Sequence, residues 1–441
     1  MHIPAEEFFP MTSSKRAARL CAVLLATTAA SGAMAQTQIT MWHQEQVQPR
    51  IDQFQVVIDA FNASQDEYEV VQQVQGWGNI YQVLPPAVDA GIQPDIQFTI
   101  PDFTVTVRDT GAVLPVTEFV AELDEAHGFI DQAALPYTDD GEVWAVPVYG
   151  MVQVLWYRKD MFEAAGLDPE TPPATWEDLL SAAETLTGKG VYGIGIPASQ
   201  SLATDQVFYS FMATNNDAEL FDADGNVIFD NPQTVATLEF YKQLADLSPS
   251  GIGSWTWAEP QDALNAGAVA MAIEKGQYLS TFESASGQPS EMLGCAPVPV
   301  ADGGERASIY YSNAAMIMTD DPERRAGAEA FLSFVLEPEN YAEFLLAEPG
   351  LFLPLTEDGA TDAWKNAEAL APYQSCLDLM TEQSAYGMLP GFNTGEVQDA
   401  IGPIAAQNIL AQVVQRAIIG DETAADAVAW GQAQMESAIA E

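Results

Sequence analysis

The chain has 441 residues, 48% of them hydrophobic, and its 63 acidic and 15 basic residues give a formal net charge of −48. This length is too great for one ordinary hydrophobic core and suits two domains of about 150–200 residues each. So acidic a surface keeps a protein soluble and argues against nucleic acid and anionic membrane as partners. The charge alone identifies no ligand.

The N-terminal segment has the three parts of a secretory signal peptide. Basic residues lie within 15–19, an apolar run covers 20–30, and small residues at 33–35 supply a cleavage site. An anchoring helix is the alternative, but the run is about half of the ~20 residues that span a bilayer. We therefore expect a signal peptide over residues 1–35, a mature chain that begins at Gln36, and a periplasmic location.

The cysteines add one structural hypothesis. Cys21 does not stand at the end of the apolar run, where a lipidated cysteine would be, so a lipoprotein signal is not expected. Cys295 and Cys376 remain in the mature chain, and in an oxidising compartment they can pair. Two separate buried thiols are the alternative. No CxxC motif or Cys/His cluster indicates zinc.

The first part of the mature chain alternates between predicted strands and helices. Strands are expected at residues 37–42, 68–74 and 95–100, with a helix that begins at Pro49 and another that ends at Gly91. This β-α-β-α-β order predicts an α/β domain with a mostly parallel sheet and right-handed crossovers. Sheets of this kind bind ligands at the carboxyl ends of their strands.

The rest of the chain continues the alternation without a long linker or an internal repeat. We therefore expect the chain to cross between two domains more than once. The expected elements are a helix capped by Thr175 and closed by Gly188, a short strand at 191–197, helices that begin at Pro232 and Pro322, and an Ala-rich helical segment from about Glu396.

The sequence lacks the motifs of common enzymes, with no HExxH, GxSxG, P-loop or GxGxxG pattern. Asp222 to Gly225 is faintly similar to a calcium loop, but it lacks the trailing ligands, so a turn between two short strands is expected. A glycosidase carboxylate pair is not distinguishable in sequence from an acidic surface. The pattern favours a binding protein that is not an enzyme and uses no catalytic residues, cofactor or metal.

Aromatic residues lie in several polar or glycine-rich segments, which suggests a sugar ligand. Sugar rings stack their C–H faces on aromatic rings, while their hydroxyls need amide and carboxylate partners. Core packing is the alternative for any one of these aromatics. The segments are residues 75–78, 254–257, 275–278, 310–313 and 391–393.

The segment 140–186 resembles the extracellular solute-binding protein family 1, which includes maltose-binding and glycerol-3-phosphate-binding proteins. That family has there an aspartate-glycine turn, a strand ending in proline, a tyrosine-rich strand, Lys-Asp, Ala-Gly-Leu and Pro-x-Thr-Trp. Further matches at 39–43, 91–95, 266–271 and 350–354 extend the resemblance over nearly the whole mature chain. Matching residues are Asp140, Gly141, Pro147, Tyr157, Lys159, Asp160, Gly166, Leu167, Pro173, Thr175 and Trp176.

The resemblance implies a two-lobed periplasmic-binding-protein fold with a ligand cleft between the lobes and several hinge crossovers. Lobe one would comprise residues 36–148 and 309–350, and lobe two residues 149–308 and 351–441. The function implied is that of the substrate-binding subunit of a bacterial ABC importer. A monomer would capture the ligand and deliver it to the permease transmembrane subunits by hinge closure.

The resemblance also implies a set of ligand-binding positions. We expect Trp77 of lobe one and Tyr278 of lobe two to face each other across the cleft, with Phe352 near the hinge. The full set of expected ligand-binding residues is His43, Glu45, Trp77, Thr99, Asp102, Tyr149, Trp257, Gln277, Tyr278, Ser312, Asn313, Phe352 and Phe392.

One departure from the family bears on the ligand. Phosphate-binding relatives carry an arginine in the C-terminal segment, and residues 392–398 here contain none. Charge-assisted bonds to phosphate usually come from arginine or lysine, and the local substitutes are Lys275 and Arg306. We therefore expect a neutral sugar, oligosaccharide or polyol. Glycerol phosphate and a polyamine, which an acidic cleft would favour, are the alternatives.

Overall fold

The computed structural model describes residues 36–440, apart from residues 109, 217 and 394–396. The predicted signal peptide, residues 1–35, lies outside the described residues, as does a short part of the C-terminal segment. Within the described ranges, no helix is long and apolar enough to cross a membrane.

The first of the two main sheets has six strands. Strand β1 (Thr37–His43) lies between β2 (Tyr68–Val74) and β3 (Ile96–Thr99) and is parallel to both. Strand β10 (Ser308–Ile317) pairs antiparallel with β3, and β6 (Val146–Val152) pairs antiparallel with β10. The predicted parallel β-α-β-α-β unit is therefore confirmed, and three later strands extend it: β10, β6 and the short β11 (Gly387–Met388), which pairs with β10.

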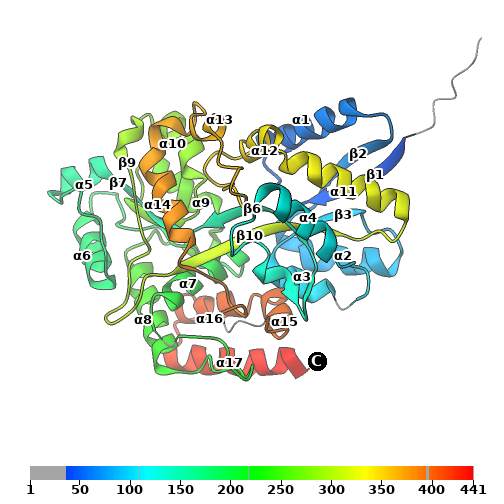
Figure 1. Ribbon diagram of the computed structural model, residues 1–441. Helices are drawn as coiled ribbons and strands as arrows, with labels where there is room; N and C mark the ends of the chain where they lie inside the picture. The colour runs from blue at the N-terminus through cyan, green and yellow to red at the C-terminus, as the bar shows by residue number, and fades with distance from the viewer. Residues whose placement is uncertain (1–35, 109, 217, 394–396, 441) are drawn as a thin grey trace, which may run out of the picture. The chain divides into compact units, whose positions relative to one another are not determined.

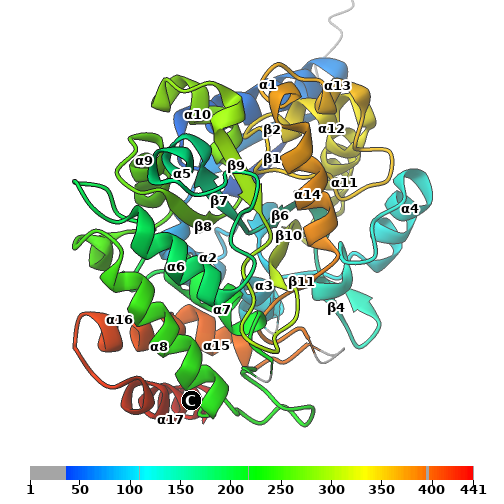
Figure 2. The ribbon, with the colours of Figure 1, turned by 90° about the vertical axis from the view of Figure 1, so that its left-hand side faces the viewer.

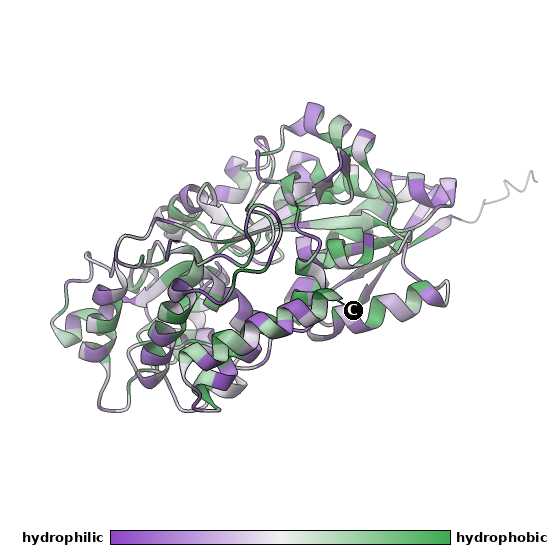
Figure 3. Ribbon diagram, turned by 90° about the horizontal axis from the view of Figure 1, so that it is seen from below, coloured by the Kyte–Doolittle hydropathy of each residue, from purple (hydrophilic) through white to green (hydrophobic). Residues whose placement is uncertain are grey.

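Helices cover both faces of this sheet. Helix α1 (Gln48–Ser64) buries Phe54, Val57, Ile58 and Phe61, whose spacing places them on one face of the helix. Figure 3 shows helices banded between hydrophilic and hydrophobic residues, as expected where one face packs inward. The other helices around this sheet are α2 (Ile80–Asp89), α3 (Pro101–Arg108), α4 (Thr117–His127), α11 (Pro322–Leu336) and α12 (Pro338–Leu345).

Strands β6 and β10 connect this sheet to the rest of the molecule, and every residue of both strands is buried. Figure 1 shows them lying between the elements around β1–β3 and those of the second half. From β6 the chain passes through Gln153 into β7 (Val154–Arg158), the central strand of a second sheet. Its neighbours are β8 (Met271–Glu274) and β9 (Leu293–Ala296), both antiparallel to β7. The predicted multiple crossing of the chain is confirmed.

The second half contains the predicted helices with their caps. Thr175 forms a reciprocal capping box at the start of α6 (Trp176–Leu186), and Asn231 caps α8 (Pro232–Asp246). Helix α7 (Leu202–Ala213) is buried along most of its length. The remaining helices of this part are α5 (Lys159–Ala165), α9 (Ala258–Asn265) and α10 (Tyr278–Ser286).

Two shorter predictions have different outcomes. The segment 191–197 is not a regular strand, because it makes only isolated bridges, from Tyr192 to Val269 and from Gly195 to Ala272. The segment from Asp222 is the predicted turn, and the Asp222 carboxylate accepts hydrogen bonds from backbone amides of the turn itself. That carboxylate therefore stabilises local backbone.

The C-terminal segment folds as separate helices that pack on both halves. Helix α15 (Ile401–Ala406) contacts α3, while α16 (Ile409–Ile418) packs on α7, α8 and α17 (Ala424–Ala440). Figure 2 shows these helices grouped beside α8. The other short elements are β4 (Thr138–Asp139), β5 (Glu142–Val143), α13 (Asp362–Lys365), α14 (Gln374–Ser384) and β11 (Gly387–Met388).

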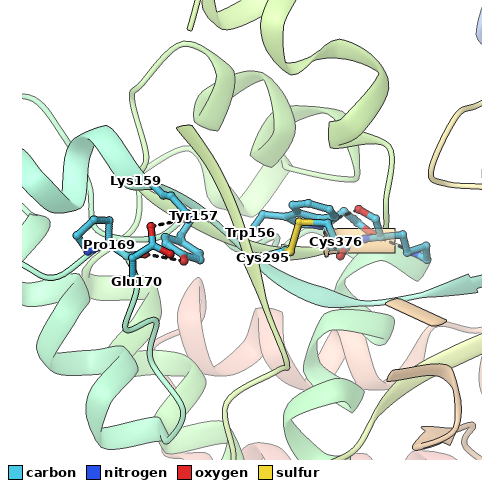
Figure 4. The surroundings of a disulfide bond; sticks show 9 residues. Trp156, Tyr157, Lys159, Pro169, Glu170, Cys295 and Cys376 are labelled. Atoms are coloured by element: carbon cyan, nitrogen blue, oxygen red, sulfur yellow. Dashed lines mark hydrogen bonds and ion pairs between the residues drawn. A yellow bond between two sulfur atoms is a disulfide. The ribbon is translucent and has the colours of Figure 1, made fainter. Parts of the chain in front are cut away.

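Cys295 of β9 and Cys376 of α14 form a disulfide, with their Cα atoms 5.9 Å apart. Figure 4 shows the bond beside Trp156 of β7. The hypothesis of a pairing between these cysteines is confirmed. The bond closes a loop with a sequence separation of 81 residues, and constraining such a loop in the unfolded chain stabilises a protein by about 4 kcal/mol.

Candidate ligand-binding cleft

A cavity of about 330 Å³ lies at the carboxyl ends of β1, β2 and β3, where open α/β sheets bind ligands. The loops after these strands form one wall, and the loop after β8, the start of α9 and the first turns of α7 form the opposite wall. Crossing strands β6 and β10 contribute the floor. The lining residues are Gln44 to Val47, Arg50, Trp77, Ile100, Met151, Leu202, Gln206, Thr256 to Ala258, Gln261, Glu274, Lys275, Gln277, Tyr311 and Leu351.

Arg50, in the first turn of α1, is held by two carboxylates. Its Nη1 lies 2.7 Å from Glu45 Oε2, and its Nε lies 2.7 Å from Glu348 Oε2. Burial lowers the pKa of Arg50, but the charges of Glu45 and Glu348 outweigh burial and raise its pKa above the usual value. The second oxygen of Glu348 accepts a hydrogen bond from Ser280 of α10 at 2.5 Å. This chain of contacts therefore joins the loop after β1 to α10.

Lys275, which follows β8, is also engaged. Its Nζ lies 2.9 Å from the buried Glu274 carboxylate and donates to Gln206 Oε1 at 2.6 Å. The same amide oxygen accepts from Trp257 Nε1 at 3.3 Å. Gln206 therefore connects the loop after β8 with the start of α9. Arg50 and Lys275, the cations that line the cleft, each have a carboxylate partner.

Two glutamines of the cleft lining each carry an acceptor oxygen that has no donor. Gln44 Oε1 and Gln277 Oε1 are buried, and neither has a hydrogen-bond partner within the described ranges of the chain. The Gln44 amide is oriented by its Nε2, which donates to the carbonyl of Phe98 at 3.0 Å. A buried acceptor left unpaired costs about 1–3 kcal/mol. A ligand that donates hydrogen bonds would recover this free energy.

Aromatic and apolar surface completes the cleft. Trp77 follows β2 on one wall and Trp257 begins α9 on the other, and both are partly exposed. Met151 of β6 and Leu351 add apolar surface to the lining. A ring-shaped ligand can therefore stack on an indole while its polar groups meet the glutamines and carboxylates.

A second, small cavity of about 30 Å³ lies directly behind the cleft. We call it the inner chamber. It shares Leu202, Gln206 and Tyr311 with the cleft, and Asp102 and Asp205 line it. One face of helix α7 serves both cavities. From Leu202, which lines both, the residues at i+3, i+4 and i+7 lie on the same face of the helix. These are Asp205 and Tyr209, which line the chamber, and Gln206, which lines both cavities.

Both aspartates of the inner chamber are buried. Burial raises the pKa of Asp102 to about 6, against a hydrogen bond from Tyr81 that lowers it. Burial raises the pKa of Asp205 to about 8, although its Oδ1 accepts from the backbone amide of Ala411 at 2.5 Å. The charge of Asp102 also contributes to the raised pKa of Asp205.

The structure brings some of the expected ligand-binding residues to these cavities. Glu45, Trp77, Trp257 and Gln277 line the cleft, and Asp102 lines the inner chamber. Phe392 lines the inner chamber and another cavity of about 450 Å³, to which Tyr310 also contributes. Successive residues of a strand point to opposite faces, so Tyr310 and Tyr311 place that cavity and the cleft on opposite faces of β10.

Tyr278 is not at the cleft, so it does not face Trp77 as the sequence analysis expects. Its ring is fully buried and stacks on Trp156, with centroids 5.3 Å apart. The reason is the turn at the start of α10, which directs Gln277 to the cleft and the next side chain into the core. Trp257 is the aromatic residue that lines this wall instead.

Six more expected residues lie in the buried layer around the strands and not at the cleft surface. The ring of Tyr149 packs against Phe352 with centroids 3.9 Å apart and planes tilted by 30°, and its hydroxyl donates to Glu45 at 3.4 Å. His43 pairs with Gln72 at 2.7 Å. These contacts support the cleft from beneath. The six residues are His43, Thr99, Tyr149, Ser312, Asn313 and Phe352.

The sequence analysis missed several residues of the cleft. Gln44 lies between the expected residues His43 and Glu45 in the loop after β1, so the position of that loop carried a signal for it, whereas Arg50 lies in the first turn of α1. Tyr311 lies in one of the aromatic, polar segments. Gln206 and Asp205 had no signal, because they lie in the middle of the sequence of a buried helix and reach the cavities only through tertiary packing.

Solved structures with the same two-lobed fold include binding proteins bound with a sugar or a polyol. A solute-binding protein of Thermotoga lettingae bound with α-D-tagatose has a TM-score of 0.77 and 22% identity, over 91% of this chain and 100% of that chain. One from Agrobacterium radiobacter K84 in complex with ribitol has a TM-score of 0.78 and 22% identity, over 91% and 98%. The chain thus adopts the two-lobed periplasmic-binding-protein fold.

The sequence itself assigns the family. The model of the bacterial extracellular solute-binding proteins matches residues 48–342, and the chain belongs to this family. The resemblance found at residues 140–186 is confirmed. The Escherichia coli K12 putative ABC transporter periplasmic-binding protein YcjN is 28% identical over 295 residues, and the match spans 64% of this chain and 64% of YcjN. The sn-glycerol-3-phosphate-binding protein UgpB of the same strain is 27% identical, over 86% and 84%.

Proposed function

We propose that the protein is the substrate-binding subunit of a bacterial ABC importer and captures a neutral sugar, short oligosaccharide or polyol in the cleft. One observation carries this proposal. The cleft offers unpaired buried acceptors, Gln44 Oε1 and Gln277 Oε1, while its cations Arg50 and Lys275 already have carboxylate partners. Such a surface suits a ligand with many hydroxyl donors.

A phosphate ester fits this surface less well. Phosphate needs charge-assisted donors, and a cation that is paired with a buried carboxylate must break that pair to supply them. The likeness to UgpB supports glycerol 3-phosphate as the alternative. A polyamine is the other alternative, since Glu45, Glu274 and the two chamber aspartates give this region more carboxylates than cations.

The size of the cleft supports a small ligand. Its volume of about 330 Å³ lies at the lower end of the roughly 300–1,000 Å³ that small-molecule sites occupy. A monosaccharide, a disaccharide or a pentitol suits this space. The relatives of known structure bound with tagatose and ribitol carry ligands of this size.

In this proposal, the lobes close on the ligand by a hinge at the crossing strands. Lobe one comprises residues 36–148 and 309–350, and lobe two residues 149–308 and 351–441. Closure would bring Trp77 and Trp257 toward each other and create the surface that the permease reads. The export signal at residues 1–35 would deliver the protein to the periplasm, where it acts as a monomeric carrier and not as an enzyme.

A ligand screen by thermal shift tests the proposal. The panel contains D-tagatose, ribitol, D-glucose, maltose, glycerol 3-phosphate and spermidine. A ligand at one hundred times its Kd stabilises the folded protein by about 2.7 kcal/mol, so the true class raises the melting temperature. We expect a neutral sugar or polyol to do so. Stabilisation by glycerol 3-phosphate or spermidine, with none by a neutral compound, would reject the carbohydrate assignment.

A further inference from the structure

Three residues line both the inner chamber and the cleft, namely Leu202, Gln206 and Tyr311. Gln206 is the central one, because its amide oxygen accepts hydrogen bonds from Lys275 Nζ and Trp257 Nε1 of the cleft while its side chain also lines the chamber. Leu202 lies one helical turn before Gln206 on the same face of α7.

One polar atom in the chamber lacks a partner. Asp205 Oδ1 accepts a hydrogen bond from the backbone amide of Ala411 in the first turn of α16. This oxygen therefore acts as a helix cap, and the other oxygen of the carboxyl group remains to be explained. Asp205 Oδ2 is buried and has no hydrogen-bond partner in the part of the chain that the structure describes. Asp102 approaches the same space from the start of α3 and accepts from Tyr81.

We infer that the inner chamber is a subsite of the cleft that takes one hydroxyl or ammonium group of the ligand between Asp102 and Asp205. This inference rests on the proposed function, since the ligand enters through the cleft. The chamber volume of about 30 Å³ fits one water-sized group, for which about 10–15 Å³ is the minimum. Its two carboxyl groups come from different elements, Asp102 from α3 and Asp205 from α7, so the group would be held between these two helices.

The chemistry of the group follows from the protonation of Asp205. When Asp205 is ionised, Oδ2 needs a donor, and a hydroxyl or an ammonium supplies one. When Asp205 is protonated, its own O–H needs an acceptor, which a hydroxyl supplies and an ammonium does not. A hydroxyl therefore satisfies the chamber in both states, whereas an amine requires the ionised carboxylate.

A crystal structure of the ligand-free protein tests the chamber without any carbohydrate. We expect one ordered water within hydrogen-bond distance of Asp205 Oδ2. This result would support a polar subsite even if the carbohydrate assignment failed. An Oδ2 atom bonded to a protein donor in a collapsed chamber would overturn the inference, whatever the screen finds.

Binding measurements test the subsite with matched probes, D-sorbitol with its amine analogue D-glucamine and D-glucose with D-glucosamine. Titration calorimetry would compare the wild type with Ala405→Leu, which fills the chamber from α15, and with Ala406→Leu, its neighbour that does not line the chamber. We expect Ala405→Leu to weaken the best probe at least tenfold and Ala406→Leu to leave it unchanged. If Ala405→Leu and Ala406→Leu bind the same probe with equal affinity, and the wild type also binds it, the subsite inference is overturned and the proposed function stays intact.

The variant Asp205→Asn distinguishes a ligand hydroxyl from a ligand ammonium as the hydrogen-bond donor in the chamber. Loss of the carboxylate should weaken an amine probe at least tenfold and a hydroxyl probe by less, because an amide can still bond a hydroxyl. A cap-only role for Asp205 predicts instead a lower melting temperature with unchanged affinity. Asp95→Asn is the control, since Asp95 pairs with Arg324 at the opposite end of β3 and should affect stability alone.

Discussion

Gly276 and Gly350 meet backbone to backbone: a Cβ atom on Gly276 would lie 1.9 Å from the carbonyl oxygen of Gly350. Gly276 stands between Lys275 and Gln277, and Gly350 directly precedes Leu351, so this contact joins two parts of the cleft lining. The loop after β8 and the segment around Gly350 are thus held at a separation that no other residue at 276 permits.

Gly276→Ala should therefore disturb the cleft and the stability together. The added methyl forces the two segments apart, and overpacking of this kind costs about 1–3 kcal/mol. Thermal unfolding and ligand titration on the same sample would measure both effects. Gly251→Ala is the control, because its Cβ would meet only Trp255 at an ordinary 3.6 Å. An unchanged affinity in Gly276→Ala would show that the loop does not depend on this contact.

Trp77→Ala should weaken ligand binding about tenfold, equivalent to about 1.4 kcal/mol, and leave the ligand-free melting temperature nearly unchanged. The reason is that Trp77 lines the cleft and is partly exposed. Trp176→Ala is the reciprocal control. Trp176 stacks on Phe240 with centroids 4.2 Å apart, so its loss should lower stability and spare affinity. A large stability loss in Trp77→Ala would place this tryptophan in the core.

Arg50→Met should destabilise the protein even without ligand. The substitution leaves the Glu45 and Glu348 carboxylates facing each other without the guanidinium between them. Removing one partner of a buried ion pair typically costs about 3–5 kcal/mol. Urea unfolding would measure the loss. The double variant Arg50→Met with Glu348→Gln should recover part of it, and no recovery would mean that the charge of Glu348 is not the cause.

The stability should fall as the pH rises from about 4 to about 8. The pKa of Asp205 is about 8 in the folded protein against 3.8 in the unfolded chain, so the folded state binds more protons in this window. The raised pKa of Asp102, about 6, acts in the same direction at lower pH. Melting temperatures at about pH 5 and about pH 8.5 would reveal the slope. Asp205→Asn should flatten it, and an identical slope in that variant would assign it to other groups.

Reduction of the disulfide should lower the free energy of unfolding by about 4 kcal/mol, because the unfolded chain regains the freedom of the closed loop. Thermal unfolding with and without a reductant would measure this. The variant with Ala at both Cys295 and Cys376 should have the lower stability and no response to reductant. A reductant effect that persists in this variant would exclude the disulfide as its origin.

The local patterns in the sequence predicted the elements well and the side-chain directions less well. Thr175 and Asn231 cap helices because capping depends on a few neighbouring residues. The position of Tyr278 is predicted wrongly because adjacent residues at the start of α10 point in different directions. Gln277 lines the cleft, and the next side chain, Tyr278, points into the core. The segment 191–197 has strand-like residues, but only isolated bridges form where its neighbours lie.

The cleft was predictable where it follows strand ends and hidden where it depends on packing between distant segments. Glu45 and Trp77 directly follow β1 and β2, and topology alone places such loops at one edge of the sheet. Asp205 and Gln206 reach the cavities because α7 lies against β10, a contact between segments about a hundred residues apart that no local pattern encodes.

Strand β10 has a consequence for the order in which this chain can fold. It covers the edge of β3 through residues 314–317, yet β3 ends at Thr99 and β10 begins only at Ser308. A nascent chain therefore carries a bare strand edge until the ribosome has passed that point, and such an edge is a template for pairing with other chains. Pairing over so long a separation is also slow. A fragment that stops before Ser308 should therefore aggregate, because its β3 edge stays uncovered.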